Sequence, residues 1–261
     1  ALGATTTVAY DEAGDAVAVT DALGATRTAA YDKAHRIVEA VDATGAITGY
    51  SYDAAGNLVG RTLPTQAMES FSYDAAGNLV RAEDARGYVT TLSYDGRGRV
   101  AEAAANDGSR ERYAYDNAGN ITSVTDALGN ATRYSYNRWG ELTGEVSAAG
   151  STAAYAYDDA GQLVRAIDAA GATAFYGYDM AGNLVSRSAG GSTERIAYDA
   201  AGNVASYTDG NGHRTTYAYD AASRLTATKD ALGQTVSIGY DAVGNAISVT
   251  DARGHETLLS Y

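Results

Sequence analysis

The side chains of this sequence that could do chemistry are recurring aspartates and three histidines. Paired carboxylates can perform general acid–base catalysis. The aspartates recur along the whole chain, however, and this favours a structural role in turns over a single active site. The histidines, His35, His213 and His255, lie far apart, and none has a cysteine or second histidine at ligand spacing. We therefore read them as surface-turn residues.

Short segments such as DAAGN and DALGN resemble calcium loops, but they lack the alternating aspartates and the closing glutamate of such loops. No phosphate loop, nucleophile elbow or kinase signature is present. The sequence thus predicts no catalytic residue, no cofactor-binding residue and no metal ligand. We expect the protein not to be an enzyme.

The aspartates belong to a repeat with a period of 21 residues, interrupted by one interval of 20 residues between Tyr178 and Tyr198. A fixed period of this length indicates one small unit stacked many times. The expected structural signature begins with Tyr10, Tyr31, Tyr52, Tyr73, Tyr94, Tyr115, Tyr136, Tyr157, Tyr178, Tyr198, Tyr219 and Tyr240. The residues that follow these tyrosines are Asp11, Asp32, Asp53, Asp74, Asp95, Asp116, Asn137, Asp158, Asp179, Asp199, Asp220 and Asp241. The glycines four residues after the tyrosines are Gly14, Gly56, Gly77, Gly98, Gly119, Gly140, Gly161, Gly182, Gly202 and Gly244, and His35 and Ser223 take this place in the other two units.

Each unit reads as two strands and two tight turns. The run before the signature tyrosine alternates, as in Tyr113 and Tyr115, so both rings are expected on one face of a strand. The aspartate after the tyrosine can accept backbone N–H bonds, and the glycine can close a short hairpin loop. A second run begins six residues after the tyrosine and ends near a second glycine. The predicted fold class is all-β, a repeat protein of about twelve units with two antiparallel strands each.

Two places depart from this pattern. Residues 61–69 contain the only proline, Pro64, and carry Gln66 where a second-turn glycine is expected, so we expect a different loop there. The 20-residue interval contains Gly190 and Gly191 and is expected to hold a shortened second turn. Neither place reads as a domain boundary. We expect residues 1–261 to form one continuous array, and we expect it to be an excerpt of a longer chain.

The number of strands has a geometric consequence. About 24 strands spaced ~4.8 Å apart form a strip ~115 Å long. Twisted open sheets of more than ~10 strands rarely stay uncurled, so the strip is expected to curve or spiral into a hollow shell or tube. The signature rings would then lie in register, where stacked or edge-on pairs contribute about 0.5–1.5 kcal/mol each. An aromatic platform for glycans or single-stranded nucleic acid is the alternative reading of these rows, and the negative net charge makes nucleic acid the weaker of the two.

The composition limits which classes of partner the protein can bind. The net charge is −13 and the basic residues form no run, which argues against nucleic acid. No stretch approaches the ~20 apolar residues of a membrane helix, so no membrane insertion is expected. The 21 tyrosines against two phenylalanines predict broad half-buried faces, and a thick globular core is not expected.

The segment from Tyr73 to Leu79, YDAAGNL, together with the second-turn segment DALG at Asp126–Gly129, strongly resembles the Rhs or YD repeat. The resemblance covers the whole chain. Members of this family include bacterial Rhs polymorphic toxins, wall-associated proteins, the shell component of ABC toxin complexes and the teneurins. The resemblance implies a β-sheet that spirals into a hollow shell, which in the bacterial toxins encloses a C-terminal toxic domain. The self-cleaving aspartate site of the bacterial shells is not recognisable here.

From this resemblance we expect a structural, non-catalytic shell segment that encapsulates a passenger polypeptide for secretion or delivery. The expected location is secreted or on a bacterial cell surface. The expected partners are neighbouring repeats of the same chain and an enclosed passenger. An open tube or filament of identical chains, used for adhesion and with glycan contact, is the alternative that the near-uniform spacing leaves open.

Overall fold

The computed structural model describes residues 5–260, and all of the regular structure there is β-strand. The chain divides into two compact units, Ala1–Ala131 and Thr132–Tyr261, which are described separately below as unit 1 and unit 2. Tyr261 lies outside the described residues. No helix within residues 5–260 is long and apolar enough to cross a membrane.

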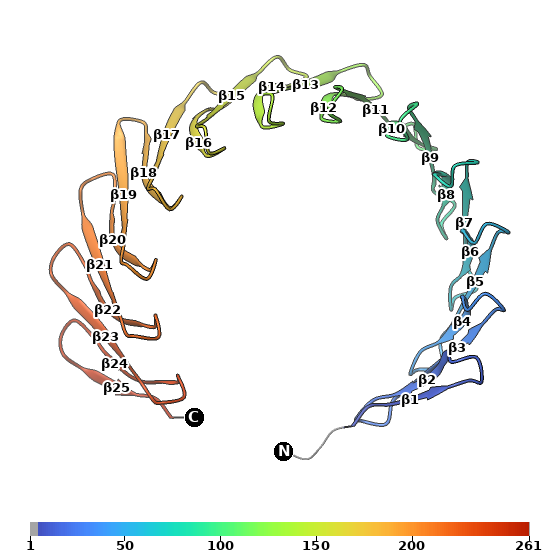
Figure 1. Ribbon diagram of the computed structural model, residues 1–261, viewed down its shortest axis with the longest axis horizontal. Coiled ribbons are helices and arrows are strands. Elements are labelled where there is room, and N and C mark those ends of the chain that lie inside the picture. Colours follow the sequence, from blue (N-terminus) through green and yellow to red (C-terminus); the bar gives the residue numbers. More distant parts are fainter. Residues whose placement is uncertain (1–4, 261) are drawn as a thin grey trace. The chain divides into compact units, whose positions relative to one another are not determined.

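Unit 1 contains twelve strands, which Figure 1 shows in chain order from dark blue to green. They are β1 (Thr7–Tyr10), β2 (Ala16–Thr20), β3 (Thr26–Tyr31), β4 (Ile37–Val41), β5 (Ile47–Tyr52), β6 (Leu58–Thr62), β7 (Met68–Tyr73), β8 (Leu79–Glu83), β9 (Val89–Tyr94), β10 (Val100–Ala105), β11 (Arg110–Tyr115) and β12 (Ile121–Thr125). Each strand pairs antiparallel with the next one along the chain.

Unit 2 repeats the same arrangement. Its strands are β13 (Ala131–Tyr136), β14 (Leu142–Val146), β15 (Thr152–Tyr157), β16 (Leu163–Ile167), β17 (Thr173–Tyr178), β18 (Leu184–Ala189), β19 (Ser192–Tyr198), β20 (Val204–Thr208), β21 (Arg214–Tyr219), β22 (Leu225–Lys229), β23 (Thr235–Tyr240), β24 (Ala246–Thr250) and β25 (Glu256–Leu258). Consecutive strands are again antiparallel partners. The predicted all-β repeat of two-stranded hairpins is confirmed.

Both turns of a repeat have one geometry. In the signature turn, the N–H of Asp53 donates to the carbonyl of Asn57 at 2.9 Å, and the N–H of Gly56 donates to the carbonyl of Asp53 at 3.1 Å. The second turn repeats these bonds, as at Asp42 and Gly45. This is a type I turn closed by a residue with positive φ, a common three-residue hairpin loop. Gly56 has a φ of 94°, which explains why glycine dominates this place.

The two non-glycine residues at the signature turn keep this geometry at a conformational cost. His35 and Ser223 have φ values of 60° and 59°. Their N–H groups still donate to the carbonyls of Asp32 and Asp220 at 3.0 Å. Positive φ is unfavourable for side chains of L-residues, so the surrounding hairpin imposes it here.

The loop expected to differ at residues 61–69 does not differ, and that prediction was wrong. The N–H of Leu63 donates to the carbonyl of Ala67 at 2.8 Å, and the N–H of Gln66 donates to the carbonyl of Leu63 at 2.9 Å. Gln66 takes the glycine conformation with a φ of 67°. Pro64 occupies the second position of a type I turn, where its fixed φ is suitable and no ladder bond is needed.

The 20-residue interval does contain the shortened turn. Ala189 pairs with Ser192, which leaves Gly190 and Gly191 as a two-residue loop with φ values of 58° and 82°. Two consecutive residues with positive φ are typical of a type I′ hairpin. One residue fewer in the loop accounts for the missing residue of the period.

A bulge that the sequence did not reveal accompanies every signature turn. In β5 and β6, for example, Ser51 pairs with Gly60 but Tyr52 pairs with Leu58, so the return strand has one extra residue. The same register shift occurs in all twelve hairpins of this kind. Bulges bend a strand and increase its twist locally.

The array has no apolar core. No hydrophobic residue within residues 5–260 is fully buried, and the one buried residue is Ser206, which is 5% exposed. The fold is therefore a single layer with two open faces, and backbone pairing and turn chemistry must supply much of what a core supplies elsewhere.

Candidate functional site

The signature aspartate is the hydrogen-bond centre of each turn. In Asp53, Oδ1 accepts the N–H groups of Ala55 and Asn57, both at 2.9 Å. All eleven signature aspartates, and Asn137 through its own Oδ1, accept at least two backbone N–H groups of their turn. Many second-turn aspartates do the same, as Asp126 does with Leu128 and Asn130.

These bonds favour the ionised carboxylate. The Arg99 side chain and then its backbone N–H lower the pKa of Asp95 from 3.8 to about 2. The amide side chains of Asn78 and Asn120 are the main cause of the lowered pKa values of Asp74 and Asp116. A lowered folded-state pKa stabilises the fold above the unfolded value and loses this contribution as the pH falls.

A further residue of the unit, five positions after the tyrosine, was missed in the sequence. In six units it is asparagine, whose Nδ2 donates to the aspartate Oδ2 at 2.9–3.1 Å. In three units it is arginine, whose Nε donates to the same oxygen at 2.7–2.8 Å. The signal that could have found it is the recurrent Asn or Arg directly after the turn glycine, or after His35 and Ser223 where they replace that glycine.

The signature tyrosines connect each hairpin to the preceding one. The hydroxyl of Tyr115 donates to the carbonyl of Val100, at the start of the previous return strand, at 2.8 Å. The same bond, at 2.7–3.1 Å, is made by Tyr31, Tyr52, Tyr73, Tyr94, Tyr178, Tyr198, Tyr219 and Tyr240. Consecutive hairpins share backbone pairs only near the second turn, as at Glu39 to Val41. At the other end, near the signature turns, the strands of neighbouring hairpins are not paired, and the tyrosine hydroxyl supplies a hydrogen bond there.

This bond takes the place of the expected contacts between rings. A whole strand separates successive signature tyrosines, which places them about 10 Å apart at the usual strand spacing. Ring pairs need centroids ~4.5–7 Å apart, so a tyrosine reaches backbone rather than the next ring. Tyr157 departs from the others, because its hydroxyl has no hydrogen-bond partner among residues 5–260. Tyr10 belongs to the first described hairpin and is 63% exposed.

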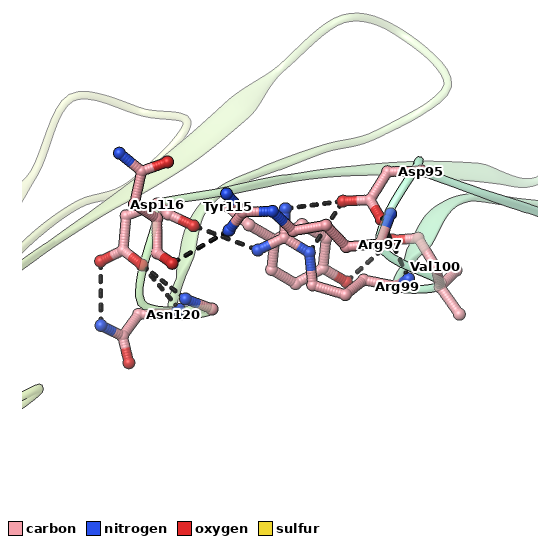
Figure 2. A network of polar contacts seen from close by, with 9 residues as sticks. Asp95, Arg97, Arg99, Val100, Tyr115, Asp116 and Asn120 are labelled. Carbon is pink, nitrogen blue, oxygen red and sulfur yellow. Dashed lines mark hydrogen bonds and ion pairs between the residues drawn. The ribbon is translucent and has the colours of Figure 1, made fainter.

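Three arginines extend the link between turns. Figure 2 shows Arg99 lying between Asp95 of its own turn and Tyr115 of the next hairpin. The Arg99 guanidinium lies 2.6 Å from Asp95 Oδ2, 4.3 Å from the centre of the Tyr115 ring and 3.1 Å from the carbonyl of Asp116. Arg36 and Arg224 likewise stack on Tyr52 and Tyr240, at 4.6 and 4.7 Å.

The histidines are turn residues. His35 Nδ1 lies 2.8 Å from Asp15 Oδ2 in the preceding turn, and this carboxylate raises the pKa of His35. His213 and His255 contact the aspartates of their own second turns, Asp209 and Asp251, at 3.0 and 3.3 Å. Within residues 5–260, no group of three or more such side chains is arranged to hold a metal ion.

The geometry therefore assigns the signature residues to joining and closing hairpins. Asp95, Tyr115 and Asp116 are linked through Arg99 into one network that crosses two repeats. What the arrangement can do chemically is hold a long single-layer sheet in register.

Comparisons with known proteins agree with this reading of the repeat. A family model described as Teneurin YD-shell matches residues 3–126. A second, described as RHS Repeat, matches residues 115–152, 157–193 and 198–235. No curated protein matches the sequence.

Solved structures share the fold over nearly the whole chain. Crystal structures of TcdB2-TccC3-TEV and TcdB2-TccC3-Cdc42 match 95% of this chain with TM-scores of 0.56 and 0.55 at 19% identity. A third, of TcdB2-TccC3 without hypervariable C-terminal region, matches equally with a TM-score of 0.55. This chain spans 18% of the length of each of those chains. Two family models that both describe this repeat, together with the strand and turn pattern above, place the chain in the Rhs/YD-repeat family.

Proposed function

We propose that this array is part of the wall of a hollow β-sheet shell that encloses a passenger polypeptide for secretion or delivery. The observation that carries the proposal is the single layer without a core. Both faces of the sheet are open to their surroundings, and no hydrophobic residue within residues 5–260 is fully buried. A sheet of this kind separates two spaces, which is what an enclosing wall requires.

The structural neighbours support the proposal through fold. TcdB2-TccC3 matches 95% of this chain with TM-scores of 0.56 and 0.55, and one of its crystal structures is without a hypervariable C-terminal region. A variable segment beside a regular repeat array is what a wall with exchangeable cargo would have. By extension, residues 1–261 of this chain form one continuous stretch of wall that winds with further repeats.

The mechanism would be steric and not catalytic. The turn aspartates are occupied by backbone N–H groups, and the signature tyrosines by carbonyls of neighbouring hairpins. Such a wall keeps proteases from the passenger and keeps the passenger from acting before release. A secreted or cell-surface location fits this role.

Protease protection of the full-length protein tests the proposal. The intact protein is treated with a non-specific protease, and fragments are identified by mass spectrometry before and after the wall is unfolded by acid. We expect a passenger segment to survive digestion until the wall opens. Equal digestion of all non-repeat segments in the folded protein would contradict enclosure and would favour an open adhesive filament of the same repeats.

A further inference from the structure

One face of the sheet carries a small side chain beside every signature tyrosine. The residue before each signature tyrosine is always alanine, serine or glycine, as at Ala114, Ser135 and Ala197. Because side chains alternate between the faces of a strand, these residues define a face opposite to the tyrosines. We call it the small-residue face. Long side chains that stand on it meet little steric competition from their neighbours.

In unit 2, four strands bring two arginines together on this face. Ser186 in β18 pairs with Arg195 in β19, Arg195 pairs with Thr208 in β20, and Thr208 pairs with Arg214 in β21. These strands lie side by side in the orange part of Figure 1. The two arginines are therefore two strands apart, about 10 Å between their backbones. Facing side chains of this length can reach one ligand between them.

The row borders an open hollow of about 470 Å³. Ser186, Arg195, Thr208 and Arg214 line it, together with Ser206. Ser206 is the one buried residue within residues 5–260. Arg214 Nη2 donates a hydrogen bond to Ser206 Oγ at 3.2 Å. This bond holds one guanidinium at the rim of the hollow. Hydroxyl groups and guanidinium groups thus converge on one place.

The charge of this hollow is uncompensated. Within residues 5–260, neither Arg195 nor Arg214 has a carboxylate within ion-pair distance. The ion pair of Arg187 with Glu194, at 3.8 Å, lies on the tyrosine face, because each residue is one position along its strand from Ser186 or Arg195. Both arginines are exposed. Guanidinium groups match oxyanions through paired N–H donors.

We propose that the hollow binds a tetrahedral oxyanion, a phosphate or sulfate group. The two guanidiniums supply charge-assisted donors, and Ser186, Ser206 and Thr208 supply hydroxyl donors around the same group. A tetrahedral anion accepts from donors on several sides, which suits a hollow bordered by arginines on both sides. The site is independent of a passenger, so it goes beyond the wall function proposed above.

Unit 1 offers a matched arrangement that carries its own counter-charge. Glu102 stands in β10 where Ser186 stands in β18, and it pairs with Arg112, the equivalent of Arg195. Glu102 Oε2 lies 2.7 Å from Arg112 Nε. The substitution Ser186→Glu therefore installs in unit 2 what unit 1 already contains, and Arg112→Gln serves as a control outside the hollow.

The test titrates the full chain with inorganic sulfate and with inorganic phosphate at pH 7. The NMR chemical shifts of the backbone amides of β18–β21 report binding, and chloride keeps the ionic strength constant. We expect saturable shifts for the wild type and for Arg112→Gln. We expect at least about a tenfold weaker affinity for Ser186→Glu and for Arg214→Gln, because a charge-assisted bond contributes ~1.5–3 kcal/mol.

Any of three results would overturn the proposal. The first is amide shifts that are no larger with sulfate than with chloride, and the second is an unchanged sulfate affinity in both Ser186→Glu and Arg195→Gln. The third is acetate that binds as tightly as sulfate. Circular dichroism of each variant checks that the sheet is intact, and Arg195→Gln, exposed on the open face, is the variant least able to disturb it. Comparing galactose 6-sulfate with galactose then separates the two sources of the anion: binding of the sulfated sugar assigns a glycan sulfate, and binding of inorganic sulfate alone assigns a free anion.

Discussion

The strands β10–β12 of unit 1 and β18–β20 of unit 2 share one strand arrangement but differ in whether the arginines of the small-residue face have a carboxylate partner. In unit 1, Glu102 pairs with both Arg110 and Arg112, at 3.4 and 2.7 Å. In unit 2, Ser186 replaces the glutamate and leaves Arg195 without an ion pair among residues 5–260. The signature turn, its bulge and the strand register are the same in both places, whereas the loop between β18 and β19 is one residue shorter than the loop between β10 and β11. The difference teaches that the repeat fixes the sheet through its turns, while the exposed face is free to vary.

Acid should have the largest effect on both units, because it protonates many turn aspartates together. The pKa of Asp95 is lowered to about 2, and that of Asp179 in unit 2 is lowered by Asn183. Ionised aspartates stabilise the fold above pH 3.8, and this contribution disappears as the pH falls through the folded-state values. We expect the thermal midpoint, followed by circular dichroism, to fall between pH 3.8 and about 2.

Substituting single aspartates tests how much of this pH dependence comes from their hydrogen-bond partners. Asp95→Asn should remove more of the pH dependence than Asp179→Asn, because Asp95 pairs with a guanidinium and Asp179 with an amide. Equal pH profiles for the two variants would show that the partner five residues after the tyrosine has no electrostatic effect.

The next largest effect concerns the hydrogen bonds of one turn. Asp116 accepts from the N–H groups of Gly119 and Asn120 and from Asn120 Nδ2, at 2.8–2.9 Å. Within residues 5–260, the Asp158 side chain in unit 2 accepts two bonds, from the N–H groups of Ala160 and Gln162. We expect Asp116→Ala to lower the free energy of unfolding more than Asp158→Ala does, because it removes one more hydrogen bond. Urea unfolding of both variants measures the difference, and a larger loss for Asp158→Ala would contradict the count of bonds.

A smaller effect isolates the tyrosine hydroxyl. Tyr115→Phe removes the bond to the Val100 carbonyl, whereas Tyr157→Phe removes a hydroxyl without a partner among residues 5–260. We expect a loss of about 1 kcal/mol in the first variant and about zero in the second. Hydrogen exchange of the amides in β10–β12 and β14–β16 measures the change in local protection. Equal protection in the two variants would mean that the hydroxyl does not join the hairpins.

The smallest expected change in stability is that of Glu102→Ser. The ion pairs of Glu102 are half-exposed, so their loss should cost less than ~1 kcal/mol. The variant should nevertheless gain sulfate-dependent amide shifts in β10–β12, because it frees two arginines on the small-residue face. Glu145→Ser, on the tyrosine face, is the matched control and should gain none. No gain in Glu102→Ser would mean that two free arginines on the small-residue face are not sufficient for anion binding.

The period and the turn residues made the hairpins predictable from sequence, because Asp and Gly at fixed spacing specify one loop. The loop at Pro64 and Gln66 was mispredicted, because glutamine adopts positive φ here when the rest of the hairpin demands it. The bulge beside Tyr52 leaves no residue signature, and the hydroxyl bond of Tyr115 depends on how the hairpins splay. The hollow at Arg195 depends on cross-strand register, which places residues from four strands together.

The enclosing wall is the central claim, and cryo-electron microscopy of the full-length protein that carries this array tests it most directly. The account predicts a closed particle whose wall is one sheet thick, with polypeptide density inside that does not belong to the repeats. A long open tube with an empty interior would contradict the account.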